Sequence, residues 1–120
     1  MTISCELRLA HAPSGPHSIS DLSIPRVGYY PRRPPPGTDR TFNYHAIVLV
    51  VAGSGTFRAN SAPPQAVEPG CIWFLHPRVH YRYGPAPGST WEEYFIDLHG
   101  AGLSRWFERG WLPRRPELWQ

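Results

Sequence analysis

The chain has 120 residues, a length that fits one domain with one modest core. Fifteen prolines and eleven glycines favour many turns and short strands over long helices. The basic residues are all arginines, and a net charge of only +3 argues against a nucleic-acid-binding surface on this segment. The sequence has no apolar run long enough for a signal peptide or a membrane span, which predicts a cytoplasmic protein.

The N-terminal third is predicted to hold two strands. Residues 2–11 alternate loosely between apolar and polar side chains, which predicts a strand, and residues 12–25 are polar and predict a loop. Residues 27–30 predict a short strand, and the proline-rich residues 31–37 predict a rigid, extended connector. Arg32 and Arg33 of this connector are interpreted as solvated, although a segment that folds over a ligand or contacts a partner domain is a second interpretation.

The strongest strand signal covers residues 40–52. Apolar residues occupy both faces of this segment, with Ala46, Val48 and Val50 on one of them, so the strand is expected to be covered on both sides. Residues 53–55 (Gly-Ser-Gly) predict a hairpin turn into a return strand that starts at residue 56. A turn at residues 62–65 and a short strand at 66–68 should follow.

Residues 67–83 combine a turn, a strand and a corner. Pro69 and Gly70 predict a chain reversal, residues 71–75 an apolar strand, and Pro77 the end of that strand. Cys71 is expected to be a small core residue, because it has no metal-binding spacing to Cys5 and nothing indicates a disulfide.

The C-terminal third predicts a strand and then a helix. In residues 91–98 one face carries Trp91, Glu93, Phe95 and Asp97. Apolar residues then follow helical spacing and end near Gly110; they are Leu103, Trp106, Phe107 and Trp111. This stripe could pack on its own domain or on a second subunit in a homodimer. Prolines at 113 and 116 are expected to stop regular structure.

The order and spacing of these parts resemble a known family. Arg40, the turn at residues 49–55, the Pro69-Gly70 turn with its strand, Pro77, and the strand from Trp91 resemble the N-terminal domain of AraC-family transcription regulators over about residues 26–112. The resemblance implies an all-β fold, a cupin-like double-stranded β-helix that forms a small antiparallel barrel with a C-terminal α-helix. It divides the chain into an N-terminal strand and arm (1–39), a barrel core (40–100) and a C-terminal helix and tail (101–120).

The resemblance also implies a function, the sensing of a small-molecule effector in the barrel. Its effector contacts fall on Arg40, Tyr83, Glu93 and Phe95, and the aromatic and polar character of Trp91 and His80 adds these two as ligand-binding candidates. Sugar-binding relatives carry His and Trp where this chain has Glu93 and Phe95, so the effector is expected to be oxygen-rich or sugar-like without being tied to that sugar. DNA would be bound only through a helix-turn-helix domain that this sequence does not contain, as if the chain were truncated before it.

The alternative function is a metal-dependent cupin enzyme, an oxygenase or isomerase, that uses His45 and His80. A catalytic metal needs about three converging ligands, but His45 stands alone where the first motif would need a cluster. In the second motif Tyr81 takes the usual histidine position, and His80 lies one residue early, which turns it to the other face of a strand. The sequence therefore predicts no metal, no cofactor, no catalytic residue and no enzymatic activity.

Overall fold

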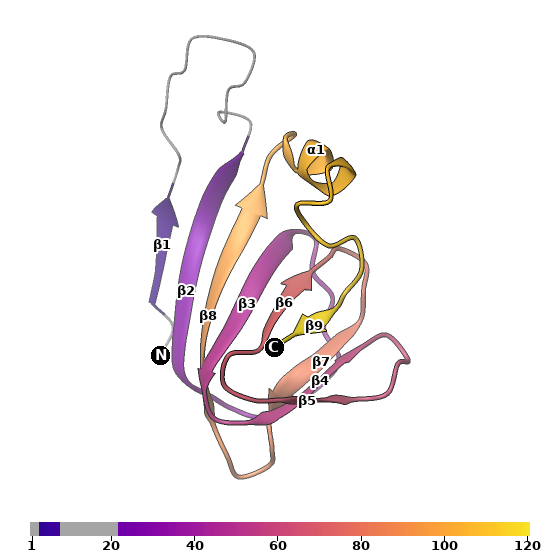
Figure 1. Ribbon diagram of the computed structural model, residues 1–120. Coiled ribbons are helices and arrows are strands. Elements are labelled where there is room, and N and C mark those ends of the chain that lie inside the picture. The colour runs from indigo at the N-terminus through magenta and orange to yellow at the C-terminus, as the bar shows by residue number, and fades with distance from the viewer. Residues whose placement is uncertain (1–2, 8–21) are drawn as a thin grey trace.

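The computed structural model describes residues 3–7 and 22–120, and side chains from residue 22 onwards. The strands in this part of the chain are β1 (Ile3–Leu7), β2 (Ser23–Arg33), β3 (His45–Ala52), β4 (Gly55–Ala59), β5 (Gln65–Val67), β6 (Ile72–Leu75), β7 (Tyr81–Pro85), β8 (Trp91–His99) and β9 (Leu118–Trp119). One helix, α1 (Leu103–Glu108), follows β8 in the described residues (Figure 1). Most of the predicted strands are therefore present, with boundaries shifted by a few residues.

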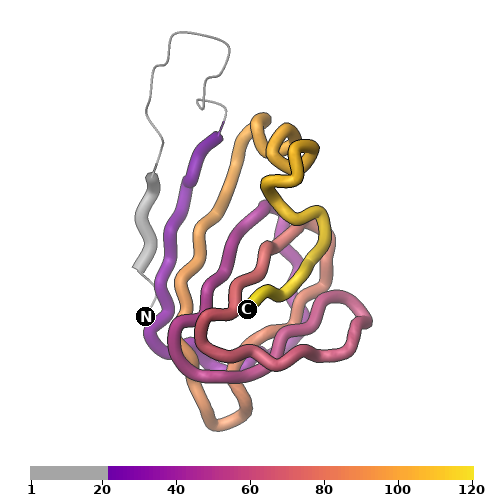
Figure 2. The backbone as a smooth tube through the Cα atoms, viewed as in Figure 1, coloured from indigo at the N-terminus to yellow at the C-terminus, as the bar shows by residue number. Residues whose placement is uncertain are grey.

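Two antiparallel sheets face each other (Figure 1). The larger has the strand order β1-β2-β8-β3-β6-β9, and the smaller has the order β5-β4-β7. The predicted hairpin at residues 53–55 is wrong, because β3 pairs with β6 and β8 whereas β4 pairs with β5 and β7. This turn instead carries the chain from one sheet to the other, as the tube in Figure 2 shows.

Strand β2 is much longer than the predicted strand at residues 27–30, and it includes the start of the predicted connector. It begins at Ser23, inside the predicted loop at 12–25, of which residues 12–21 lie outside the described part. Its pairing with β8 shifts between Tyr30, opposite Glu93, and Arg33, opposite Trp91. Three residues along β2 therefore match two along β8, which is a β-bulge. The bulge accommodates Pro31, which has no N–H to donate to the ladder.

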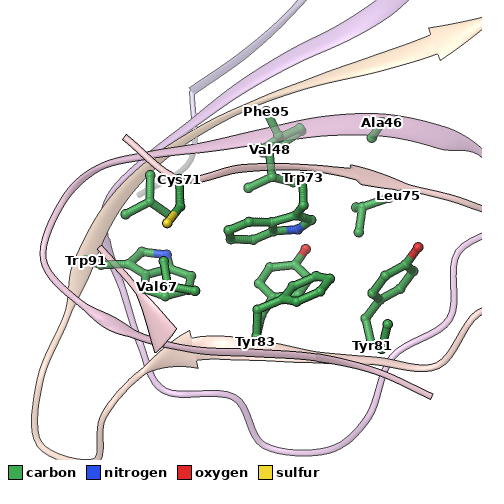
Figure 3. Packing of buried hydrophobic residues seen from close by; sticks show 13 residues of the cluster. Ala46, Val48, Val67, Cys71, Trp73, Leu75, Tyr81, Tyr83, Trp91 and Phe95 are labelled. Atoms are coloured by element: carbon green, nitrogen blue, oxygen red, sulfur yellow. The ribbon is translucent and has the colours of Figure 1, made fainter. Parts of the chain in front are cut away.

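The main core lies between the two sheets. Figure 3 shows Val48 and Trp73 of the larger sheet packed against Tyr81 and Tyr83 of β7. Trp73 is fully buried, and its ring centroid lies 4.9 Å from that of Tyr83. Cys71 is a buried free thiol in the same cluster, as expected. Burying these aromatic rings supplies much of the driving force for closing the two sheets on each other.

A second cluster covers the outer face of the larger sheet. Leu103 of α1 is buried there with Phe74 and Leu98, and Trp106 and Phe107 pack at its edge. The apolar stripe of the predicted helix therefore packs on its own domain, while Trp111 beyond the helix is 59% exposed. No helix in the described residues is long and apolar enough to cross a membrane.

The segment after the helix returns to the sheet, which contradicts the expectation that prolines 113 and 116 end regular structure. Leu118 pairs with Trp73 and Trp119 with Ile72, so β9 adds a short strand beside β6. Strands β2 and β9 lie outside the predicted core at residues 40–100, yet both belong to the larger sheet. The division of the chain into arm, barrel core and C-terminal part, with boundaries after residues 39 and 100, remains a prediction.

Candidate functional site

A cavity of about 330 Å³ opens between the two sheets. Strands β2, β3, β6, β7 and β8 contribute to its wall, together with the segment that precedes β3. Its volume lies at the lower end of the range of roughly 300–1,000 Å³ for small-molecule sites. The lining residues are Arg26, Tyr30, Arg33, Arg40, Phe42, Tyr44, Ala46, Val48, Leu75, Tyr83, Glu93, Phe95 and Asp97.

Four of the six ligand-binding candidates line this cavity: Arg40, Tyr83, Glu93 and Phe95. Glu93 and Phe95 project from one face of β8, because side chains two residues apart in a strand point the same way. Tyr83 comes from β7 in the facing sheet. The backbone of Arg40 exchanges two hydrogen bonds with Tyr81, of 2.8 and 2.7 Å, and these hold Arg40 beside β7. That these four residues contact a ligand remains a prediction.

The other two candidates, Trp91 and His80, are not among the lining residues. Trp91 is 1% exposed and donates a 2.8 Å hydrogen bond from Nε1 to Glu93 Oε1, so it supports a lining residue from behind. His80 is exposed near the corner between β6 and β7, where its backbone N–H donates to Asn60 Oδ1. The structure therefore gives neither side chain direct access to the cavity.

Glu93 is the most buried charged residue of the cavity, at 1% exposure. Its Oε1 accepts from Trp91 and also lies 3.1 Å from Arg33 Nε. Burial raises the pKa of Glu93, and Arg33, the Trp91 hydrogen bond and Arg40 oppose that rise. Arg33 is itself held between aromatic rings, with its guanidinium carbon 5.0 Å from the ring centres of both Tyr30 and Tyr83. The pair is thus a fixed, buried charge arrangement in the cavity wall.

A second ion pair lies farther along the same two strands. Arg26 Nε of β2 lies 2.8 Å from Asp97 Oδ2 of β8, and Arg26 also donates to the Tyr44 hydroxyl at 3.0 Å. The guanidinium of Arg26 stacks 5.0 Å from the ring centre of Phe95. Asp97 is 5% exposed, and its other oxygen, Oδ1, has no hydrogen-bond partner within the described residues.

Phe95 lies directly over a glycine of the neighbouring strand. Gly28 of β2 pairs with Phe95 across the ladder, and a Cβ at position 28 would overlap the outer ring atoms of Phe95. The ring can lie flat across β2 only because residue 28 has no side chain. Gly28 therefore sets how far Phe95 reaches into the cavity.

Tyr83 and Tyr81 both carry neutral hydroxyl groups. Burial raises the pKa of Tyr83 well above its usual value and that of Tyr81 to about 12. The Tyr81 hydroxyl is engaged, because it accepts a 2.9 Å hydrogen bond from the backbone N–H of His76. Tyr83 is the one of the two that lines the cavity, so it presents a neutral hydroxyl there.

Several lining residues were not predicted, above all Arg26 and Arg33. Strand alternation places Arg26 on the same face as Gly28 and Tyr30. The predicted strand at residues 27–30 began too late to include Arg26. The same alternation leads forward to Arg32, but the bulge turns Arg33 inward and leaves Arg32 exposed. The interpretation of Arg33 as solvated is therefore wrong. Asp97 could have been found, because it follows Glu93 and Phe95 on their face of β8.

The histidines of the alternative enzyme lie outside the cavity. The ring of His45 contacts those of His76, 5.6 Å away, and Phe107, 5.2 Å away, on the outer face of the sheet. Burial lowers the pKa of His45, and His76 and His99 lower it further. Among the side chains that the structure describes, from residue 22 onwards, no three His, Cys, Asp or Glu residues converge as a metal site would require.

Solved structures with a similar fold include cupin proteins. An RmlC-like cupin family protein with a double-stranded β-helix fold from Methanocaldococcus jannaschii aligns with a TM-score of 0.53 and 11% identity, over 88% of this chain and 86% of that one. A Cupin 2 conserved barrel domain protein from Salinispora arenicola gives 0.53 and 13%, over 90% and 84%. The protein YhaK from Escherichia coli gives 0.58 and 13%, with 98% of this chain matching 48% of that longer chain. At these identities the likeness establishes the fold, which is the predicted cupin-like double-stranded β-helix.

The sequence itself matches one protein family. No curated protein matches the chain, but the family described as the AraC-like ligand binding domain matches residues 29–119. This range includes the predicted contacts at Arg40, Tyr83, Glu93 and Phe95 and runs through β9. The match therefore spans most of the chain and nearly the whole cavity wall, and the chain belongs to the family of AraC-like ligand binding domains.

Proposed function

We propose that this domain senses a small-molecule effector in the cavity between its two sheets and does so without catalysis. The observation that carries the proposal is the convergence of Arg40, Tyr83, Glu93 and Phe95 on one cavity from segments far apart in the sequence. A guanidinium, a neutral hydroxyl and an aromatic ring together suit an oxygen-rich compound that also has an apolar face.

In this proposal the domain works in the cytoplasm as the sensor of an AraC-type regulator, in which a helix-turn-helix domain outside this sequence binds DNA. Effector binding would change the affinity of that domain for its operator, and by thermodynamic linkage operator DNA would change effector affinity by the same factor. Homodimer formation belongs to the same proposal, with the exposed Trp111 beyond α1 as a candidate contact. Family membership supports the sensing role.

A thermal-shift screen tests the sensing role. The 120-residue chain is heated with a panel of sugars, polyols, hydroxy acids and carboxylic acids, and compounds that raise Tm are titrated against two variants. Arg40→Ala should weaken their binding by about 1.5–3 kcal/mol, the range for a hydrogen bond to a charged group. Arg32→Ala is the matched control, because Arg32 is exposed and does not line the cavity. A panel that shifts nothing, or hits that bind both variants equally well, would contradict the proposal.

A further inference from the structure

The charged side chains that line the cavity carry more positive than negative charge. Three arginines line it, Arg26, Arg33 and Arg40, against two carboxylates, Glu93 and Asp97, which leaves one positive charge. Arg26 pairs with Asp97 at 2.8 Å and Arg33 with Glu93 at 3.1 Å. Within the described part of the chain no carboxylate forms an ion pair with Arg40. The excess charge therefore lies on Arg40.

Asp39, the acidic residue next to Arg40, is engaged elsewhere. Its carboxylate lies 3.2 Å from Arg58 and 3.7 Å from Arg82, and these two contacts direct it toward the strands of the smaller sheet. Asp39 therefore does not supply the charge that Arg40 lacks. The guanidinium of Arg40 is therefore available to an anionic group of a ligand in the cavity.

The guanidinium of Arg40 is also held in a suitable orientation. Its carbon lies 4.9 Å from the ring centre of Phe42, and the Arg40 backbone is fixed by its two hydrogen bonds to Tyr81. A guanidinium that stacks by its face keeps the N–H donors at its edge available, and those donors match the two oxygens of a carboxylate. Arg40 is exposed, so an anion can reach it from solvent.

Beside its polar groups the cavity wall also has an apolar part. Phe42, Val48, Leu75 and Phe95 contribute side chains with no polar group, and the cavity volume of about 330 Å³ limits the ligand to a small molecule. A carboxylate would gain a charge-assisted interaction with Arg40 that a neutral ligand lacks, and a dianion would bring a second negative charge while the other two arginines of the cavity are already paired. A cation would meet the excess positive charge.

We propose that the cavity selects a small monocarboxylic acid with an apolar or aromatic body, whose carboxylate pairs with Arg40 while its body packs against Phe42 and Phe95. This inference rests on the proposed function and names the chemical class of its effector. It separates the domain from sensors of neutral sugars, because the selected property is a single negative charge.

The test compares matched probes that differ mainly in charge. Benzoate, the neutral benzamide, the dianion phthalate and the cation benzylamine are titrated into the 120-residue chain by calorimetry, with L-arabinose as a neutral polyol. We expect benzoate to bind about ten times more tightly than each of the others, or better still, as one charge-assisted carboxylate interaction would give. Raising the salt concentration should weaken benzoate binding more than benzamide binding.

Two variants assign the effect to Arg40. Arg40→Gln should remove the preference for benzoate over benzamide, while Arg32→Gln should keep it, and circular dichroism checks that both remain folded. If benzamide or arabinose binds as tightly as benzoate, or if Arg40→Gln keeps the preference, the charge inference is overturned while the sensing function stands. If no probe of any charge class binds at millimolar concentration, this inference and the proposed function both fail.

Discussion

The buried pair between Arg33 and Glu93 allows a quantitative prediction about stability. The side chains of Arg33 and Glu93 are 11% and 1% exposed, so both charges are largely removed from water. In the Glu93→Met variant Arg33 would keep its charge without a partner, and the Trp91 N–H would lose its acceptor. Breaking a buried ion pair from one side costs about 3–5 kcal/mol. This is a large fraction of the roughly 5–15 kcal/mol by which a domain is usually stable.

Urea unfolding followed by circular dichroism measures this cost. With an m-value near 2 kcal/mol/M, a loss of 3–5 kcal/mol lowers the midpoint by about 1.5–2.5 M. The double variant Arg33→Met/Glu93→Met removes both charges and keeps similar volume, so it should regain part of the loss. The recovery should be incomplete, because Trp91 Nε1 still lacks its acceptor, at a cost of about 1–3 kcal/mol. A single variant within about 0.5 M of the wild type, or a double variant no more stable than the single, would refute this account of the pair.

Three further predictions follow from the cavity wall and the histidines. Gly28→Ala should push the Phe95 ring into the cavity, destabilise the fold by about 1–3 kcal/mol and weaken benzoate binding, measured by urea unfolding and calorimetry. Burial lowers the pKa of His45 and of His76, so the folded state binds fewer protons than the unfolded state. The unfolding free energy should therefore fall as the pH drops below 6.5, and His45→Gln should reduce that fall; an unchanged slope in the variant would count against this cause. Metal analysis of the purified protein should give well below one equivalent of iron, manganese, nickel or zinc; a full equivalent bound by His45 and His80 would favour the enzyme instead.

The faces of the strands could be predicted from the sequence, because alternation is a local property. Alternation along β8 places Trp91, Glu93, Phe95 and Asp97 on one face, and all four are buried. A regular strand has the same alternation wherever it lies in the sheet, so no knowledge of its neighbours was needed. The convergence of Glu93 and Phe95 on one cavity follows from this alternation.

The partners of the strands could not be predicted in the same way. Residues 53–55 have the composition of a hairpin turn, but a glycine turn also serves where the chain leaves one sheet for the other. The bulge in β2 reverses the alternation after Tyr30, and nothing local to Arg32 and Arg33 reveals which of them turns inward. That distinction depends on the pairing with β8, more than fifty residues farther along the chain.

The short strand β9 has a consequence for how the domain behaves in solution. Without Leu118 and Trp119, the apolar strand β6 would form the edge of the larger sheet, and its backbone groups on that side would be unpaired. An open apolar edge of this kind is a template for pairing with another chain. With β9 in place, the edge is only two residues long and follows a proline at 116, both of which discourage such pairing. A chain shortened before residue 117 is therefore expected to self-associate through β6 as its concentration rises.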